Sequence, residues 1–336
     1  MTYINGALCF IIPVLVCAIS AVGSSDVIEL EQYSINHISV SGLSSGAYFA
    51  VQYHISHSAY VNGSGIFAGG PFYCAQSNLE YAEHKCMDTT LGPPEVEELI
   101  ALTRTDHTLG FVDNPDRNLK NDNIYLFSGN LDTVVDQRVV KALEQYYLAF
   151  SNNVVADYHV DAEHCIPTIN YGENCNTLSS PYIGKCNFDG AKAALETIYG
   201  KSLSQGKAIP ENLFKFNQKP YYFSQYTAIG DIGYIYIPTA CQSKGTDCAL
   251  HISFHGCQQN LELIGPEYAT HAGFNQWAEA NNIIVVYPYV TVSKTTPYNP
   301  KGCWDWWAYT GVYYGTKEGP QVQFVHKIVE RITGGV

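Results

Sequence analysis

The most constraining feature of the chain is a short strand pattern that ends in a Gly-x-Ser-x-Gly turn. Residues 38–46 read Ile-Ser-Val-Ser-Gly-Leu-Ser-Ser-Gly, and residues 47–57 favour a helix. In this context the two glycines let the strand and the helix pass close together, while Ser44 lies exposed on a strained turn. A turn of this kind presents a nucleophilic serine, so the segment predicts a serine hydrolase.

A second motif comes after the serine in the sequence, although a motif of this kind normally comes before it. Residues 250–257, Leu-His-Ile-Ser-Phe-His-Gly-Cys, resemble a strand that ends in His-Gly and normally supplies an oxyanion amide upstream of the serine. Here the motif follows the serine by more than two hundred residues. A helix expected over 320–332 carries its apolar residues on one face. Joining its end to the mature N-terminus would restore the usual order, so we predict a circularly permuted α/β-hydrolase fold whose termini lie close together.

Strand and helix patterns alternate along the rest of the chain. Strands are expected over 65–68, 123–129, 154–160, 232–237, 249–254 and 283–287, and helices over 95–103, 133–150, 189–199, 266–281 and 320–332. Alternation of this kind indicates a mostly parallel sheet with helices on both faces. No repeat, low-complexity tract or linker interrupts the pattern, so residues 24–336 are expected to form a single catalytic domain.

The candidate triad follows from the order of the chemistry-bearing residues. A serine hydroxyl becomes a good nucleophile when a histidine, oriented by a carboxylate, takes its proton. In α/β-hydrolases the acid follows a strand and the histidine lies in a later loop. Asp132 follows the strand at 124–128, and His164 follows the strand at 154–160. We therefore predict Ser44 as nucleophile, Asp132 as acid and His164 as base.

The oxyanion hole requires two backbone N–H groups near the serine. We expect one from Ser45, the residue after the nucleophile, and the other from Cys257 in the loop after the His-Gly strand end. His255 is expected to support this loop by holding its backbone. A disulfide at Cys257 is compatible with this role, because catalysis needs only its amide.

The cysteine pattern agrees with export to an oxidising compartment. Two of the eleven cysteines, Cys9 and Cys17, lie in the expected leader, which leaves an odd number in the mature chain. Spacing favours the bridges Cys74–Cys86, Cys175–Cys186, Cys241–Cys248 and the long-range Cys257–Cys303. Cys165 is then left over and is interpreted as a buried free thiol. No Cys or His cluster has zinc spacing, so we expect neither a metal nor another cofactor.

The N-terminal segment reads as a secretory signal peptide. Residues 1–23 carry no charged side chain, and an apolar stretch at 8–16 is followed by small residues. We expect cleavage after Ser20 or Gly23, with an uncut signal anchor as the alternative. No other segment is long and apolar enough to cross a bilayer. The mature protein is therefore expected to be secreted.

Charge and surface motifs narrow the range of partners. The formal net charge of −13 argues against nucleic-acid binding. Asn62 begins the only N-glycosylation sequon, Asn-Gly-Ser, in an expected loop. We expect a monomer, and the candidate triad favours an ester as its partner.

Four motifs together resemble the secreted polyhydroxyalkanoate (PHB) depolymerases. They are VSGLSSGAY at 40–48, GIFAGGP at 65–71, HGCQQ at 255–259 and NPKGCWDWW at 299–307. The resemblance runs from about residue 38 to residue 332, and the motif order is similar to the circularly permuted, single-domain type known from fungi. It implies an esterase acting on 3-hydroxyalkanoate polyesters, with the same triad and oxyanion residues as those assigned above.

The resemblance does not decide how the substrate is bound or which ester is the natural substrate. Many bacterial members add a separate polymer-binding domain that is not recognised here, so polymer adsorption is expected to rest on the catalytic domain itself. Trp306 and Trp307 are candidates for a wall of the substrate cleft, with core packing as the alternative. A feruloyl or acetyl carbohydrate esterase is the nearest alternative function. A non-catalytic binding protein on the same fold and a thiol enzyme using Cys165 are more distant ones.

Overall fold

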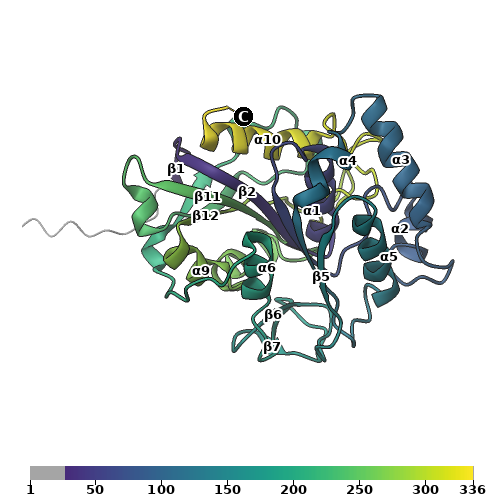
Figure 1. The fold of residues 1–336 in the computed structure, drawn as a ribbon, viewed down its shortest axis with the longest axis horizontal. Coiled ribbons are helices and arrows are strands. Elements are labelled where there is room, and N and C mark those ends of the chain that lie inside the picture. The colour runs from purple at the N-terminus through teal and green to yellow at the C-terminus, as the bar shows by residue number, and fades with distance from the viewer. Residues whose placement is uncertain (1–26, 336) are drawn as a thin grey trace, which may run out of the picture.

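A nine-stranded sheet forms the centre of the molecule in a computed structural model that describes residues 27–335 (Figure 1). Its strands are β1 (Val27–Ile28), β2 (Ser34–Leu43), β3 (Gly63–Phe67), β4 (Asn123–Phe127), β5 (Asn153–Asp157), β9 (Leu213–Asn217), β10 (Ile232–Tyr236), β11 (Asp247–Phe254) and β12 (Ile283–Tyr287). They lie in the order β1-β9-β10-β12-β11-β2-β3-β4-β5. Only β10 pairs antiparallel with its neighbours in this sheet. The predicted signal peptide, residues 1–23, lies outside the described residues.

Helices cover both faces of the sheet (Figure 1). α1 (Ser45–Ser56) and α10 (Pro320–Thr333) pack on one face, and α6 (Gly190–Tyr199) and α9 (Phe274–Asn281) pack on the other. The remaining helices are α2 (Leu79–His84), α3 (Val96–Thr108), α4 (Pro115–Asn118), α5 (Gln137–Leu148), α7 (Leu261–Ile264) and α8 (Glu267–His271). None of the helices between residues 27 and 335 has the length and apolar character to span a membrane.

The pairing of β2 with β11 brings the two distant sequence motifs side by side. The two strands run parallel, with Phe254 of β11 opposite Gly42 of β2. The chain before β2 is bonded to the end of α10, since the Tyr33 amide donates to the Ile332 carbonyl oxygen at 2.8 Å. The two ends of the described chain therefore meet, as a permuted order requires. The prediction of a circularly permuted α/β-hydrolase fold is confirmed.

Some predicted elements have different limits in the structure. The helix expected over 266–281 is divided into α8 and α9, because Gly273 between them has a φ of 93°. The helix expected from residue 133 begins at Gln137 instead. The strand β9 was not predicted, nor was a small second sheet of β6 (Ile166–Thr168), β7 (Glu173–Asn174) and β8 (Ile183–Lys185). β6, β7 and β8 have only two or three residues each, too few to establish the alternation by which strands are predicted. β9 does alternate, with Phe214 and Phe216 separated by Lys215, and this pattern was missed.

The described chain contains four disulfides at the pairs that the spacing favoured: Cys74–Cys86, Cys175–Cys186, Cys241–Cys248 and Cys257–Cys303. Cys165 is a buried free thiol. Burial, together with the charges of Asp132 and Glu163, raises the pKa of this thiol to about 12. The sequon residue Asn62 is exposed just before β3, and its Oδ1 accepts a hydrogen bond from the Ile38 amide at 3.1 Å.

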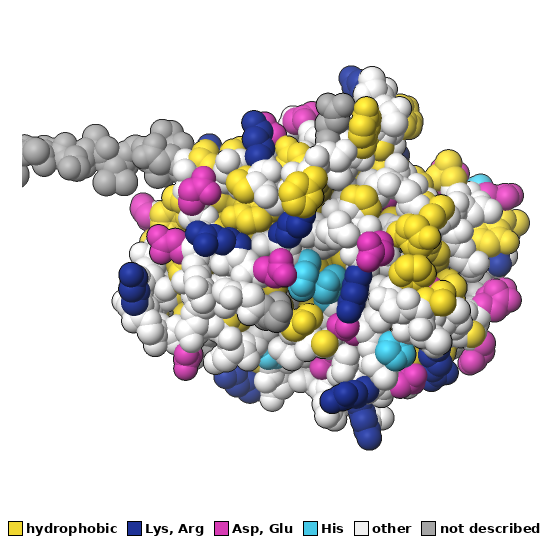
Figure 2. Space-filling model, turned by 90° about the horizontal axis from the view of Figure 1, so that it is seen from above, with side chains coloured by type: hydrophobic (Ala, Val, Ile, Leu, Met, Phe, Trp, Pro, Cys, Tyr) yellow, Lys and Arg dark blue, Asp and Glu magenta, His cyan; other side chains and the backbone are white. Residues whose placement is uncertain are grey.

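A stack of aromatic rings fills the contact between α1 and α10. The His57 ring lies 4.8 Å from the Tyr53 ring and 4.1 Å from the His326 ring, measured between centroids. Figure 2 looks down on the α10 side and shows histidine side chains at the centre of this face, flanked by basic and acidic groups. Burial, reinforced by His326 and Lys317, lowers the pKa of His57 to about 2.

We expect the contribution of His57 to stability to depend on pH. Its pKa in the folded state lies far below the ordinary value of 6.5, so the unfolded state takes up the extra proton. The contribution is therefore complete above pH 6.5 and is lost as the pH falls below it. His57→Gln should destabilise the protein at about pH 7.5, and this loss should shrink by about 1.4 kcal/mol per pH unit below pH 6.5. Urea unfolding of both proteins measures this, and a difference that stays constant with pH contradicts it.

Candidate active site

The Gly-x-Ser-x-Gly segment forms a sharp turn between β2 and α1. Ser44 adopts φ 57° and ψ −123°, a conformation that residues with a Cβ atom rarely occupy. A Cβ atom at Gly42 would lie 2.2 Å from the Gly46 carbonyl oxygen, and one at Gly46 would lie 2.3 Å from the Phe254 carbonyl oxygen. Glycine is thus required at both positions. The Ser44 amide donates to the Phe67 carbonyl oxygen at 3.0 Å, which fixes the turn to the end of β3.

Asp132 and His164 come together from the loops that follow β4 and β5. His164 Nδ1 lies 2.8 Å from Asp132 Oδ2, and both side chains are buried, with 7% and 1% of their surfaces exposed. Asp132 Oδ1 accepts hydrogen bonds from the amides of Val134 and Val135, each at 2.8 Å. Because Oδ1 is held by these two donors, the carboxylate presents Oδ2 to the imidazole. α5 begins after this turn, at Gln137, and is capped by Asp136, whose side chain accepts the Arg138 amide.

A second carboxylate, which sequence reasoning did not single out, joins these two loops. Glu163 is buried, and its Oε2 accepts hydrogen bonds from the His164 amide at 2.6 Å and the Thr133 amide at 3.2 Å. Its Oε1 accepts from the Thr133 hydroxyl. Nearby, the Leu131 amide donates to the Ala162 carbonyl oxygen at 3.1 Å. These contacts hold the loop of the acid against the loop of the base.

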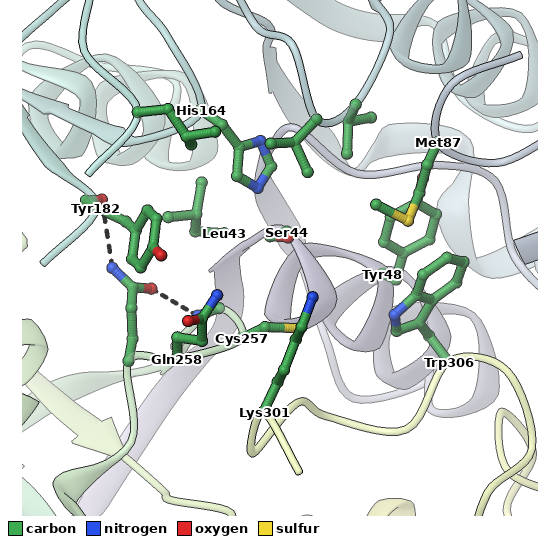
Figure 3. A pocket seen from close by; sticks show the side chains of 15 residues that line it. Leu43, Ser44, Tyr48, Met87, His164, Tyr182, Cys257, Gln258, Lys301 and Trp306 are labelled. Atoms are coloured by element: carbon green, nitrogen blue, oxygen red, sulfur yellow. Dashed lines mark hydrogen bonds between the residues drawn. The ribbon is translucent and has the colours of Figure 1, made fainter. Parts of the chain in front are cut away.

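Ser44 and His164 face each other across one pocket (Figure 3). The imidazole ring points toward Ser44. No hydrogen bond joins the two side chains in the described residues, and such contacts are often longer before substrate binds. The structure therefore brings together the residues predicted as nucleophile, acid and base.

The loop after β11 lies at the edge of the same pocket, where Gly256 and Cys257 line it. The Gly256 amide donates to Oε1 of the buried Gln259 at 2.6 Å, and Gln259 Nε2 donates to the Tyr182 carbonyl oxygen at 3.3 Å (Figure 3). Gln259 Nε2 also donates to the Pro181 carbonyl oxygen at 2.8 Å. Gln259 belongs to the His-Gly-Cys-Gln-Gln motif, but its role was not predicted. It fixes the shape of the loop from inside.

His255 supports this loop from its other side. Its Nδ1 lies 2.7 Å from the Gly256 carbonyl oxygen and its Nε2 lies 3.4 Å from the Val290 amide, which fits a neutral ring that donates from Nδ1. Burial lowers the pKa of His255 to about 4. Within residues 27–335, the amides of Ser45 and Cys257 donate to no protein acceptor. Two unpaired N–H groups beside a serine are what an oxyanion hole requires.

The walls of the pocket are mostly apolar. They include Leu43, Met87, Val134, Val135, Leu178 and Trp306. Trp306 stacks on Tyr48 with ring centroids 4.2 Å apart. Trp307, the other tryptophan predicted for the cleft, does not line this pocket and packs against Trp306 and Tyr309. The arrangement of a half-buried alcohol that lines the pocket, a histidine–carboxylate pair and two free amides at an apolar pocket is suited to acyl transfer from an ester.

The chain is similar in sequence to two characterised proteins. It is 38% identical over 325 residues to a poly(3-hydroxybutyrate) depolymerase of Delftia acidovorans, which covers 95% of this chain but only 64% of that relative. It is 34% identical over 317 residues to a polyhydroxybutyrate depolymerase of Talaromyces funiculosus, with 89% of this chain and 90% of the relative covered. The chain thus spans less than two thirds of the Delftia protein. No family model matches it.

Two solved structures have the same fold. One is a serine-to-alanine variant of a PHB depolymerase complexed with an R3HB trimer, with a TM-score of 0.84 and 32% sequence identity. The other is the PHB depolymerase from Penicillium funiculosum, with a TM-score of 0.83 and 33% identity. Each match covers 92% of this chain and 99% of the other.

Proposed function

The chain belongs to the PHB depolymerase family, and from this premise we propose that it is a serine esterase that hydrolyses short-chain poly(3-hydroxyalkanoate) polyesters or their oligomers. The observation that carries the proposal is the turn at Ser44 facing His164, which is hydrogen-bonded to Asp132. The R3HB trimer bound by a relative of the same fold supports a 3-hydroxybutyrate ester as the substrate.

In the proposed reaction the Ser44 hydroxyl attacks the ester carbonyl while His164 Nε2 takes its proton. The Ser45 and Cys257 amides donate to the oxyanion of the tetrahedral intermediate. Asp132 keeps the Nδ1 proton in place and stabilises the imidazolium. His164 then gives its proton to the leaving alkoxide, which departs as an alcohol. Water then attacks the acyl carbonyl while His164 takes its proton. His164 returns this proton to the departing Ser44 oxygen, and the product leaves as a carboxylic acid that ionises in solution.

The apolar wall with Trp306 suits the methyl, methylene and methine groups of a hydroxybutyrate unit, which make up its hydrocarbon surface. We infer a substrate-contacting role for Trp306 and an indirect role for Trp307, which packs against it. Burying apolar groups of this size is worth about 0.8 kcal/mol per methylene.

We also propose that residues 1–23 direct export and that residues 24–336 act as one monomeric catalytic domain in the extracellular medium. The four disulfides support this, because such bonds persist in oxidising compartments. The exposed Asn62 is the proposed glycosylation site.

The substrate class is tested with the purified mature protein on an amorphous poly(3-hydroxybutyrate) suspension and on p-nitrophenyl butyrate. We expect clearing of the suspension, release of 3-hydroxybutyrate acids and cleavage of the soluble ester. Cleavage of the soluble ester alone would favour feruloyl or acetyl esters as the substrate class, and these esters are then assayed directly. Failure to cleave any ester would favour a binding protein.

A further inference from the structure

The pocket beside Ser44 contains one permanent positive charge. Lys301 is the single lysine or arginine among the residues that line it, and no aspartate or glutamate lines it. In the part of the chain that the structure describes, no salt bridge involves Lys301. The protein as a whole carries a formal net charge of −13. Most Lys and Arg side chains of the described residues form no salt bridge, so the absence of a partner does not set Lys301 apart. Its position does, because it is the one lysine or arginine that lines a pocket shared with Ser44 and free of carboxylates, where an anionic part of a substrate can reach it.

The backbone of Lys301 is held firmly beside the oxyanion loop. Its carbonyl oxygen accepts a hydrogen bond from the Gln258 amide at 2.7 Å, and the Cys257–Cys303 disulfide brackets the contact. Gly302, with a φ of 57°, allows Asn260 to pack directly against the turn. The Lys301 side chain is exposed, and in Figure 3 it extends from this turn toward Ser44. A fixed backbone with an adaptable side chain keeps the ammonium group at the pocket.

The chemistry of a short oligomer supplies the missing anion. A 3-hydroxyalkanoate oligomer ends in a free carboxylate, which lies on the side of the leaving alcohol. In the last ester of the chain, only a few bonds separate this carboxylate from the scissile ester oxygen. An acidic protein repels such anions over about a Debye length, so a local cation improves their capture. An ammonium–carboxylate contact is also a charge-assisted hydrogen bond.

We propose that Lys301 binds the terminal carboxylate of short 3-hydroxyalkanoate oligomers while their last ester carbonyl lies at Ser44. This rests on the proposed function and adds a preference for free-acid oligomers over neutral esters of the same length. Lys301 exchanges no proton in the reaction; water is consumed, and one hydroxy acid and a shortened oligomer acid are released. With this contact, the same active site hydrolyses the soluble oligomers released from a polymer to monomers.

The test compares the linear 3-hydroxybutyrate trimer as a free acid, the same trimer as its methyl ester, and p-nitrophenyl butyrate. Lys301→Met removes the charge at similar length, and Lys301→Arg retains it. We expect Lys301→Met to raise KM for the free acid about fivefold, the upper range for an exposed ion pair, with little change for the two neutral esters. Lys301→Arg should keep the wild-type preference. Raising salt from about 0.05 M to about 0.5 M should shrink the difference in KM for the free acid between wild type and Lys301→Met, because both proteins share the repulsion by the acidic surface and only wild type has the local attraction.

Two results would overturn this inference. One is an equal loss on the free acid and the methyl ester in Lys301→Met, which would place Lys301 against the neutral part of the substrate. The other is a KM for the free acid that is the same in wild type and Lys301→Met at low salt. A wild type that cleaves p-nitrophenyl butyrate but neither trimer would instead refute the proposed substrate class, so the two failures are distinguishable.

Discussion

Replacing Ser44 by alanine is expected to lower kcat on p-nitrophenyl butyrate by about 10⁵- to 10⁶-fold, the range for loss of the nucleophile from a serine triad. The alanine removes only the Oγ atom, so the pocket walls, the His164–Asp132 bond and the free amides should remain. What is left is the smaller catalysis that oxyanion donors and binding provide without a nucleophile. Single-turnover and steady-state assays measure this, with circular dichroism as a check on folding.

The matched control is Cys165→Ala. Cys165 is adjacent in sequence to His164, so it is the group that a thiol enzyme would use. Burial and two nearby carboxylates raise its pKa to about 12, which leaves almost no thiolate at neutral pH. We expect this variant to keep activity within a few-fold of wild type. Loss of activity in Cys165→Ala, with activity retained in Ser44→Ala, would assign the chemistry to the thiol.

Ser44→Gly separates the chemistry of this position from its backbone strain. The Ser44 φ of 57° favours glycine, and strain of this kind costs about 1–3 kcal/mol. The glycine variant should therefore be as inactive as the alanine variant but more stable toward urea. Equal stability of the two variants would show that the turn stores no such strain.

The parts of the site that lie on motifs could be predicted from the sequence. The Gly-x-Ser-x-Gly turn identifies Ser44, because only glycine tolerates the contacts at positions 42 and 46. The order of strands then limits where an acid and a base can follow. The helix expected from residue 133 begins instead at Gln137, where a second capping residue, Asp136, accepts the Arg138 amide; the sequence offers both aspartates as caps and does not decide between them.

The parts that the sequence does not reveal depend on contacts between distant loops. Glu163 has no motif of its own, and its role arises because its carboxylate meets the Thr133 amide from another loop. Gln259 stands in a recognisable motif, but its partners, Pro181 and Tyr182, come from a segment about eighty residues away in sequence. Trp306 and Trp307 are the same residue type at adjacent positions, so the sequence does not show which one lines the pocket. In the structure Trp306 stacks on Tyr48 and lines it.

Replacing Asp132 by asparagine is expected to lower kcat by about 10⁴-fold, because the asparagine should invert the tautomer of His164. Oδ1 of Asp132 accepts two backbone N–H bonds, from Val134 and Val135, which only an oxygen can accept. The side-chain carbonyl of the asparagine must occupy this position, so its NH₂ group faces His164 Nδ1. A donor there makes Nδ1 an acceptor and places the ring proton on Nε2. The base then has no lone pair facing Ser44.

Asp136→Asn tests the same chemical change at a position where it should be harmless. Asp136 caps α5 by accepting the Arg138 amide at 2.8 Å, and asparagine caps helices equally well. We expect its kcat to stay within a few-fold of wild type, while Asp132→Asn folds normally and fails in catalysis. Nitrogen-15 NMR of the His164 ring reports the tautomer directly. A variant at Asp132 that keeps the proton on Nδ1 yet loses activity would show that the negative charge, rather than the orientation of the ring, is what the triad requires of this residue.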